Sequence, residues 1–147
     1  QIVILVHNFT LNFNNSDKEV CLNLHKLCPS SILIDKNIST GKLKNILSNS
    51  RFSISSRYHV VVGSISQDIP SIAIGWNPKY ESFLKLYDKI SWNIDFSNSA
   101  FKQINSLLEN DDFISSKNKL KKRNDVLKDK VLESFNLLFN QISSDLN

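Results

Sequence analysis

Short runs of branched apolar residues alternate along this chain with segments whose apolar residues recur at helical spacing. The runs expected to be strands are residues 2–6, 31–34, 51–55, 72–76 and 90–94. The first run is continuously apolar, which is typical of a strand buried on both faces of a parallel sheet. The alternation of strands with helices predicts an α/β fold, with a Rossmann-like, mostly parallel sheet flanked by helices.

Helices are expected between these strands and after the last one. The first begins at Ser16 or Asp17 and runs to about Leu27, with Val20 and Leu24 on the same face as Leu27. A second begins at Ser39 or Thr40, and others cover residues 57–67, the segment from Pro78, and residues 98–108 and 117–142. Residues 57–67 contain a valine run with strand propensity, but the alternation of elements favours a helix there.

Two loops and one apolar stripe complete the pattern. Residues 7–15 are expected to form a polar loop, and residues 109–116 a short loop that contains the Asp111–Asp112 pair. The last helix is lysine-rich at its start, which is typical of a solvated face, and it carries one apolar stripe. The stripe comprises Leu120, Leu127, Val131, Phe135, Leu138 and Ile142.

Composition narrows the class of protein. A chain of 147 residues fits a single domain, and 18 Lys and Arg against 14 Asp and Glu give a net charge of only +4. We therefore expect no nucleic-acid partner. No apolar run approaches the ~20 residues needed to span a bilayer. The chain contains no methionine, so we expect it to be a fragment or a processed product.

The two cysteines, Cys21 and Cys28, are seven residues apart, along and just after one predicted helix. A disulfide bond between them is geometrically unfavourable, so we expect free thiols in a reducing compartment. Two cysteines without suitably spaced histidines do not form a zinc site, and we expect no metal.

Polar side chains follow several of the predicted strands, and ligands bind at that edge of a parallel α/β sheet. Ser56, Arg57 and His59 lie where a strand ends and a helix begins, and Lys79 is placed similarly after the next strand. Unpaired N–H groups at a helix start favour an anion, a guanidinium pairs with carboxylate or phosphate, and a histidine exchanges protons near neutral pH. Together these groups indicate a pocket for a small anion that carries several charges.

Simpler roles are open for each of these residues. Arg57 can pair with a carboxylate such as Asp35 or Asp68, and His59 can be a half-buried, hydrogen-bonded histidine. Lys79 and Tyr80 can be ordinary surface residues of a helix. Trp76 can pack in the core or lie at its rim, and His7 can be a plain loop residue.

The order of these segments resembles the polysaccharide pyruvyl transferase family. The segments are Ser55-Ser56-Arg57-Tyr58-His59, then Gln67-Asp68-Ile69-Pro70, then Ile72-Ala73-Ile74-Gly75-Trp76-Asn77-Pro78-Lys79-Tyr80. That family has a strand ending in a small-x-Arg-aromatic/Leu-His motif, a helix, a turn with a small residue and proline, and a strand leading to a lysine. The resemblance is strongest over residues 43–87.

The resemblance implies a fold, a reaction and roles for site residues. It implies the C-terminal, donor-side half of a two-domain enzyme of glycosyltransferase-B-like shape, with residues 1–147 as a single α/β domain and a further half upstream. The implied reaction transfers pyruvyl from phosphoenolpyruvate to a glycan sugar as a ketal, in the cytoplasm or at the membrane periphery. His59 and Arg57 would be catalytic, and Ser56, Asn77, Lys79 and Tyr80 would bind substrate together with Arg57. The implied ligands are phosphoenolpyruvate as donor and a saccharide as acceptor, with no cofactor.

Two other functions are compatible with the pattern. One is the C-terminal domain of a glycosyltransferase of the same shape that uses a nucleotide sugar. The other is a non-catalytic domain that retains the fold. The sequence has no glycine-rich phosphate-binding loop, which argues against a dinucleotide site or a P-loop.

Overall fold

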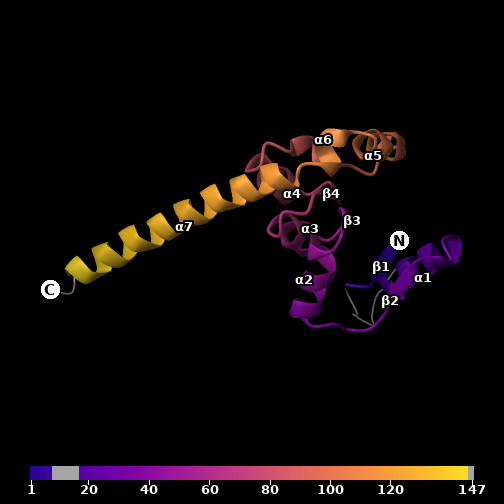
Figure 1. The fold of residues 1–147 in the computed structure, drawn as a ribbon, viewed down its shortest axis with the longest axis horizontal. Coiled ribbons are helices and arrows are strands. Elements are labelled where there is room, and N and C mark those ends of the chain that lie inside the picture. The colour runs from indigo at the N-terminus through magenta and orange to yellow at the C-terminus, as the bar shows by residue number, and fades with distance from the viewer. Residues whose placement is uncertain (8–16, 146–147) are drawn as a thin grey trace. The chain divides into compact units, whose positions relative to one another are not determined.

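The structure, a computed structural model, describes residues 1–7 and 17–145, which form two compact units, Gln1–Leu43 and Lys44–Asn147. Most of the loop predicted for residues 7–15, and the alternative helix start at Ser16, lie outside the described residues. Strands and helices alternate along the chain, as the colours of Figure 1 show, and every described strand pair is parallel. The predicted α/β class is confirmed.

The described residues of the first unit form a two-stranded parallel sheet, one helix and the start of α2 (Thr40–Ser48). Strand β1 (Val3–Leu5) pairs with β2 (Ile32–Ile34), and α1 (Asp17–Leu27) lies between them in sequence. The Cys21 thiol lies 3.6 Å from the carbonyl oxygen of Leu5, and His25 Nδ1 lies 2.8 Å from Ser31 Oγ. Both contacts join α1 or its following turn to the strands.

Burial in this unit differs from the sequence prediction. Strand β1 was predicted to be fully buried, but Val3 is 43% exposed, and the apolar face of α1 formed by Val20, Leu24 and Leu27 is exposed. The physical reason is that two short strands and one helix provide too few layers to cover both faces of the sheet. Helix α1 instead packs through its half-buried residues, which include Cys21 and His25.

The second unit contains a three-stranded parallel sheet in the order β3-β4-β5. These strands are β3 (Ser53–Ser55), β4 (Ser71–Ile74) and β5 (Asn93–Ile94), and a short 3₁₀ helix, η1 (Ile90–Trp92), precedes β5. Helix α3 (Tyr58–Ile65) connects β3 to β4, so the ambiguous valine segment is helical. Helix α4 (Pro78–Lys85) follows β4, and α2 (Thr40–Ser48) precedes β3.

The core of this unit forms around β4, on which Ile72 and Ala73 are completely buried. Side chains from α3, α4 and α6 pack against it, including Val61 and Leu84. A group of serine hydroxyls lies at the start of the sheet: Ser53 Oγ lies 2.8 Å from Ser64 Oγ and 2.7 Å from Ser71 Oγ. These hydrogen bonds allow polar residues to occupy buried positions of β3, β4 and α3.

Three helices complete the chain: α5 (Ala100–Leu108), α6 (Asp111–Ile114) and α7 (Lys117–Asp145), as drawn in Figure 1. The prediction that residues 109–116 form only a loop is therefore wrong. Asn110 caps α6 by accepting a hydrogen bond from the Asp112 amide at 2.8 Å. Phe113 is 2% exposed and packs edge-on against Trp92, with ring centroids 4.9 Å apart. A polar cap and a buried aromatic residue stabilise this short helix.

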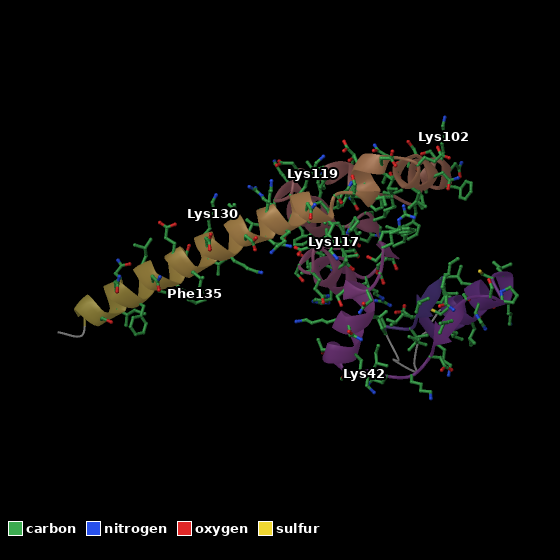
Figure 2. All side chains as sticks on the ribbon, in the orientation of Figure 1. Lys42, Lys102, Lys117, Lys119, Lys130 and Phe135 are labelled. Atoms are coloured by element: carbon green, nitrogen blue, oxygen red, sulfur yellow. The ribbon has the colours of Figure 1, made fainter. Side chains whose placement is uncertain are left out.

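Helix α7 is attached to the unit through its first two turns. Leu120 is buried, and the Asn124 amide donates hydrogen bonds to the carbonyl oxygen of Ile65 at 2.7 Å and to Asp68 Oδ1 at 2.8 Å. The Tyr87 hydroxyl donates to Asn124 Oδ1 at 2.8 Å. Residues 128–143 are exposed, including the labelled Lys130 and Phe135 of Figure 2. Of the predicted stripe, only Leu120 is therefore buried, and Leu127 is half-buried.

None of the helices in residues 17–145 is both long enough and apolar enough to cross a membrane.

Candidate functional site

The site lies where β3 and β4 end. Because these strands are parallel and Ser55 pairs with Ala73, their carboxyl ends lie at the same edge of the sheet. Ser56 follows β3, and Gly75, Trp76 and Asn77 follow β4. The alternation of strands and helices therefore places the two segments singled out from the sequence next to each other.

Tyr80 connects the two strand ends. It is 5% exposed, and its hydroxyl donates a hydrogen bond to the carbonyl oxygen of Ser56 at 2.6 Å. Its ring lies directly against Gly75, where an added Cβ would approach Tyr80 Cε2 to 2.8 Å. Burial raises the pKa of the Tyr80 phenol above 10.0, and the charge of Arg57 opposes that rise. The phenol is therefore a neutral hydrogen-bond donor at neutral pH.

Tyr58 is the centre of a second set of contacts. Its ring packs edge-on against Tyr80, with centroids 5.7 Å apart, and against His59, with centroids 5.8 Å apart. The ammonium group of Lys79 lies 5.0 Å from the Tyr58 ring centroid and 5.7 Å from that of Tyr80. Such cation–π contacts are worth about 0.5–1 kcal/mol at exposed sites. His59 therefore lies against the Tyr58 ring, and Lys79 lies against the rings of both Tyr58 and Tyr80.

Arg57 completes the group of cationic residues. It is half-buried and immediately precedes α3, and its backbone amide donates to Ser55 Oγ at 2.9 Å. Its guanidinium is near enough to Tyr80 for its charge to lower the phenol pKa. No side chain of the described residues caps α3, whereas α4 is capped by Asn77, which accepts from the Lys79 amide at 3.1 Å. The start of α3 is thus the better of the two helix ends for an anion.

A pocket of about 180 Å³ opens between the strand ends. Four of the predicted substrate-binding residues line it, Ser56, Asn77, Lys79 and Tyr80, together with Ile74, Gly75, Trp76 and Phe96. Arg57 and His59 are not among the described lining residues. His59 is exposed and lies against the Tyr58 ring. Lys79 therefore belongs both to the pocket and to the group of cationic residues, and Tyr80 lines the pocket and contacts Lys79.

Three residues of the site have no role in the sequence analysis. Tyr58 was quoted only as part of the motif, although an aromatic residue between arginine and histidine at a helix start is itself a signal. Gly75 follows an apolar strand, where a glycine marks a close approach by another group. Phe96 follows β5 by two residues, and no sequence signal connects it with β4.

The structure also places two further candidates, Trp76 and His7. Trp76 is 80% exposed, so packing in the core, one of its open alternatives, is wrong. His7 is exposed and belongs to the first unit.

The chemistry open to this group is the binding of a small anion. A guanidinium, an imidazole and an ammonium lie around two tyrosine rings, beside the start of a helix. Within residues 1–7 and 17–145, no group of three or more histidine, cysteine, aspartate or glutamate side chains is arranged to hold a metal ion.

Comparison with known proteins adds one finding. The chain matches the family model described as polysaccharide pyruvyl transferase over residues 1–78. The match includes Ser56, Arg57, His59 and Asn77, and it stops one residue before Lys79. It begins earlier and ends earlier than residues 43–87, the segment that carries the strongest resemblance in the sequence analysis. No curated protein matches the chain, and no solved structure matches it. The matched segment covers more than half of the sequence, and the chain belongs to the polysaccharide pyruvyl transferase family.

Proposed function

We propose that this chain is the donor-side domain of an enzyme that transfers pyruvyl from phosphoenolpyruvate to a glycan sugar as a ketal. The observation that carries the proposal is the gathering of Arg57, His59 and Lys79 around the Tyr58–Tyr80 pair. Phosphoenolpyruvate carries a carboxylate and a phosphate close together. Those two groups match one guanidinium, one ammonium and the uncapped start of α3.

The reaction requires one proton transfer to carbon. A proton added to the enol methylene produces the methyl group and makes the adjacent carbon electrophilic. One sugar hydroxyl attacks that carbon, a second displaces phosphate, and the two hydroxyl protons balance the methyl group and the released phosphate. In this proposal His59 supplies the proton to the methylene, a contribution of ~10²–10⁴ in rate. Arg57 and Lys79 hold the acidic groups and stabilise the departing phosphate.

The remaining predicted site residues would contact substrate from the pocket. Ser56 and Asn77 offer a hydroxyl and an amide to the pocket, and Tyr80 fixes the spacing between the two strand ends. His59 does not line the pocket, but it and Lys79 both touch the Tyr58 ring. A donor held between Arg57 and Lys79 along that ring would therefore lie within reach of the imidazole.

The wider organisation is part of the same proposal. Residues 1–147 would form the C-terminal, donor-side part of a two-domain enzyme of glycosyltransferase-B-like shape, with an upstream half that contributes to the acceptor site. The support is the family membership of the chain and its parallel α/β elements. The product would be a pyruvylated cell-surface glycan, made in the cytoplasm or at the membrane periphery.

Donor binding is tested by calorimetric titration of phosphoenolpyruvate into the 147-residue chain. Arg57→Gln and Lys79→Gln each remove a charged hydrogen-bond partner, so binding is expected to weaken by about 10- to 150-fold. Lys89→Gln is the matched control, because Lys89 also lies over an aromatic ring, that of Trp92 at 5.4 Å, and does not line the pocket. Its affinity for phosphoenolpyruvate is expected to be unchanged.

The same titration separates the competing functions. Binding of a nucleotide sugar such as UDP-glucose without binding of phosphoenolpyruvate would contradict the proposal and favour a glycosyltransferase. Binding of neither ligand would favour a non-catalytic domain. Catalysis by His59 is tested in the two-domain enzyme, in which His59→Ala should retain donor binding and lose transfer. Wild-type transfer by that variant would remove His59 from the mechanism.

A further inference from the structure

Two exposed aromatic rings stand at the same pocket. Trp76 is 80% exposed and Phe96 is 73% exposed, and both line the 180 Å³ pocket together with Ser56, Asn77 and Lys79. Isolated exposed apolar residues are common on protein surfaces and need no explanation. Two large rings that open onto one pocket with polar groups are a different observation, because they form a single surface that a ligand can cover.

Strand register explains how these two rings come together. Strands β4 and β5 are parallel, and Ile74 pairs with Ile94. The Gly75 amide extends this ladder by donating to the carbonyl oxygen of Ile94 at 2.9 Å. Trp76 and Phe96 each follow a member of the Ile74–Ile94 pair by two residues, beyond the ends of β4 and β5, so both lie where neighbouring strands leave the sheet. Both residues line the same pocket, which places them within reach of one small molecule.

The chemistry of the pocket favours a sugar ring. A pyranose presents C–H groups on its faces and hydroxyls around its edge, so it needs an aromatic surface beside hydrogen-bonding groups. Trp76 and Phe96 provide the surface, and the Ser56 hydroxyl, the Asn77 amide and the Lys79 ammonium provide hydrogen bonds. The pocket is smaller than the ~300–1,000 Å³ typical of sites for larger ligands, which suits one sugar ring better than an entire nucleotide sugar.

We propose that Trp76 and Phe96 form a stacking platform for a saccharide, placed beside the anion-binding group. That this saccharide is the acceptor of pyruvyl rests on the proposed function; the binding of a sugar ring does not. Lys79 contributes to both parts, because it lines the pocket and lies over Tyr58. A sugar on the platform therefore has its hydroxyls beside the donor held by Arg57 and Lys79.

Sugar binding is measured by ligand-observed NMR titration of the 147-residue chain with the methyl β-glycosides of glucose and galactose and the methyl α-glycoside of mannose. At least one glycoside is expected to bind. Trp76→Ala and Phe96→Ala are each expected to weaken its binding by about 2- to 12-fold, the effect of losing one aromatic contact. Phe101→Ala is the matched control, because Phe101 is 75% exposed in the same unit and does not line the pocket. Circular dichroism establishes that each variant is folded.

Tryptophan fluorescence provides an independent readout. The chain has two tryptophans, of which Trp76 is exposed and Trp92 is 3% exposed. A sugar that covers Trp76 should shift its emission to shorter wavelength and protect it from quenching by iodide. The same sugar should leave the emission of the Trp76→Ala variant unchanged.

Three results would overturn the platform. The first is that none of the glycosides binds. The second is that both alanine variants bind as well as the unmodified chain. The third is that uridine or adenosine protects Trp76 better than the glycosides do, which would assign the rings to a nucleobase. Sugar binding through Trp76 without any binding of phosphoenolpyruvate would leave the platform in place and contradict the proposed donor site, so the two proposals fail separately.

Discussion

Gly75→Ala is the sharpest test of how the site is built, because one methyl group would enter the contact between β4 and Tyr80. The new Cβ would lie 2.8 Å from Tyr80 Cε2 and 3.4 Å from Cδ2 and Cζ. The ring has to retreat until the nearest separation reaches the ordinary contact range of 3.4–4 Å. Gly75 does not have a positive φ, so the expected effect is one of space and not of backbone strain.

The Tyr80 ring has little freedom to retreat. It is 5% exposed, its hydroxyl donates to the carbonyl oxygen of Ser56 at 2.6 Å, and its ring packs edge-on with that of Tyr58. Overpacking of this kind costs about 1–3 kcal/mol. For a chain of this size that free energy corresponds to a fall in Tm of roughly 3–12 °C. Displacement of Tyr80 would also move Lys79 and Tyr58, so the affinity for phosphoenolpyruvate is expected to fall with it.

The chain provides a matched control for this substitution. At Gly63, within α3, an added Cβ would meet Leu47 Cδ1 at 3.5 Å, which is an ordinary contact. Gly63→Ala is therefore expected to raise the free energy of unfolding by about 0.5–1 kcal/mol through helix propensity. Urea and thermal unfolding of the two variants and the unmodified chain give the comparison.

Gly75→Ala combined with Tyr80→Leu tests whether the Tyr80 ring causes the expected loss of stability. With Tyr80→Leu in place, most of the ring that obstructs the new methyl is absent, so the added cost of Gly75→Ala should shrink by about 0.5–3 kcal/mol. The reasoning is refuted if Gly75→Ala is as stable as the unmodified chain, or if its cost is the same with leucine at position 80.

Three further predictions concern the second unit. Burial raises the pKa of Tyr80, so the contribution of its phenol to stability is present below pH 10.0 and is lost as the pH rises through the raised folded-state pKa. Urea unfolding between about pH 9 and pH 11 should show that Tyr80→Phe reduces the fall of the unfolding free energy with pH. An unchanged pH slope in the variant would contradict this prediction. Asn124→Ala should lower the free energy of unfolding by about 1–3 kcal/mol, because the Ile65 carbonyl and the Asp68 carboxylate lose their donor; a smaller change in urea unfolding would count against that role. Truncation after Leu127 should change Tm by only a few °C, because residues 128–143 are exposed, whereas truncation after Lys119 should prevent cooperative unfolding.

The order and type of most elements could be predicted because they depend on local pattern. Strand and helix periods and the helix start at Pro78 are visible in consecutive residues. The helix over the valine run was predictable only from the alternation of elements, since its local propensity favours a strand. Helix α6 was missed because its stability comes from the Asn110 cap and from Phe113 packing on Trp92, a contact that links residues far apart in sequence.

Burial was harder to predict than secondary structure. An apolar pattern predicts which residues can be buried. Their burial also requires a second layer of helices or strands that packs against them. The continuous apolar run of β1 and the stripe of α7 both read as buried, but Val3 of β1 is exposed, Ile4 and Leu5 are half-buried, and the stripe beyond Leu127 is exposed. Helix α7 is held by Leu120 and by the polar Asn124, whose amide reaches the end of α3 and which no helical periodicity would select.

The site was partly predictable for a related reason. Polar and charged residues after strands are visible in sequence, so Ser56, Arg57, His59 and Lys79 could be chosen, and the roles of Asn77 and Tyr80 followed from the resemblance. The sequence does not show the aromatic contacts that set the distances between these side chains. Tyr58 and Tyr80 meet only because β3 and β4 are neighbours, and Phe96 reaches the pocket only because Ile74 pairs with Ile94.

The contact between Tyr58 and Tyr80 gives a physical reason for the aromatic residue at position 58. Cations gathered in one place repel one another, and each would turn towards water if nothing held it there. The Tyr58 ring offers Lys79 a favourable cation–π contact at 5.0 Å, and the charge of Arg57 acts on Tyr80, which is buried beside Tyr58. The contacts of the two rings thus keep the Lys79 ammonium and the charge of Arg57 close to the same pair of aromatic side chains. Under the proposed function, a small anion would meet an arrangement whose geometry is already organised, which is a physical reason for an aromatic residue between arginine and histidine.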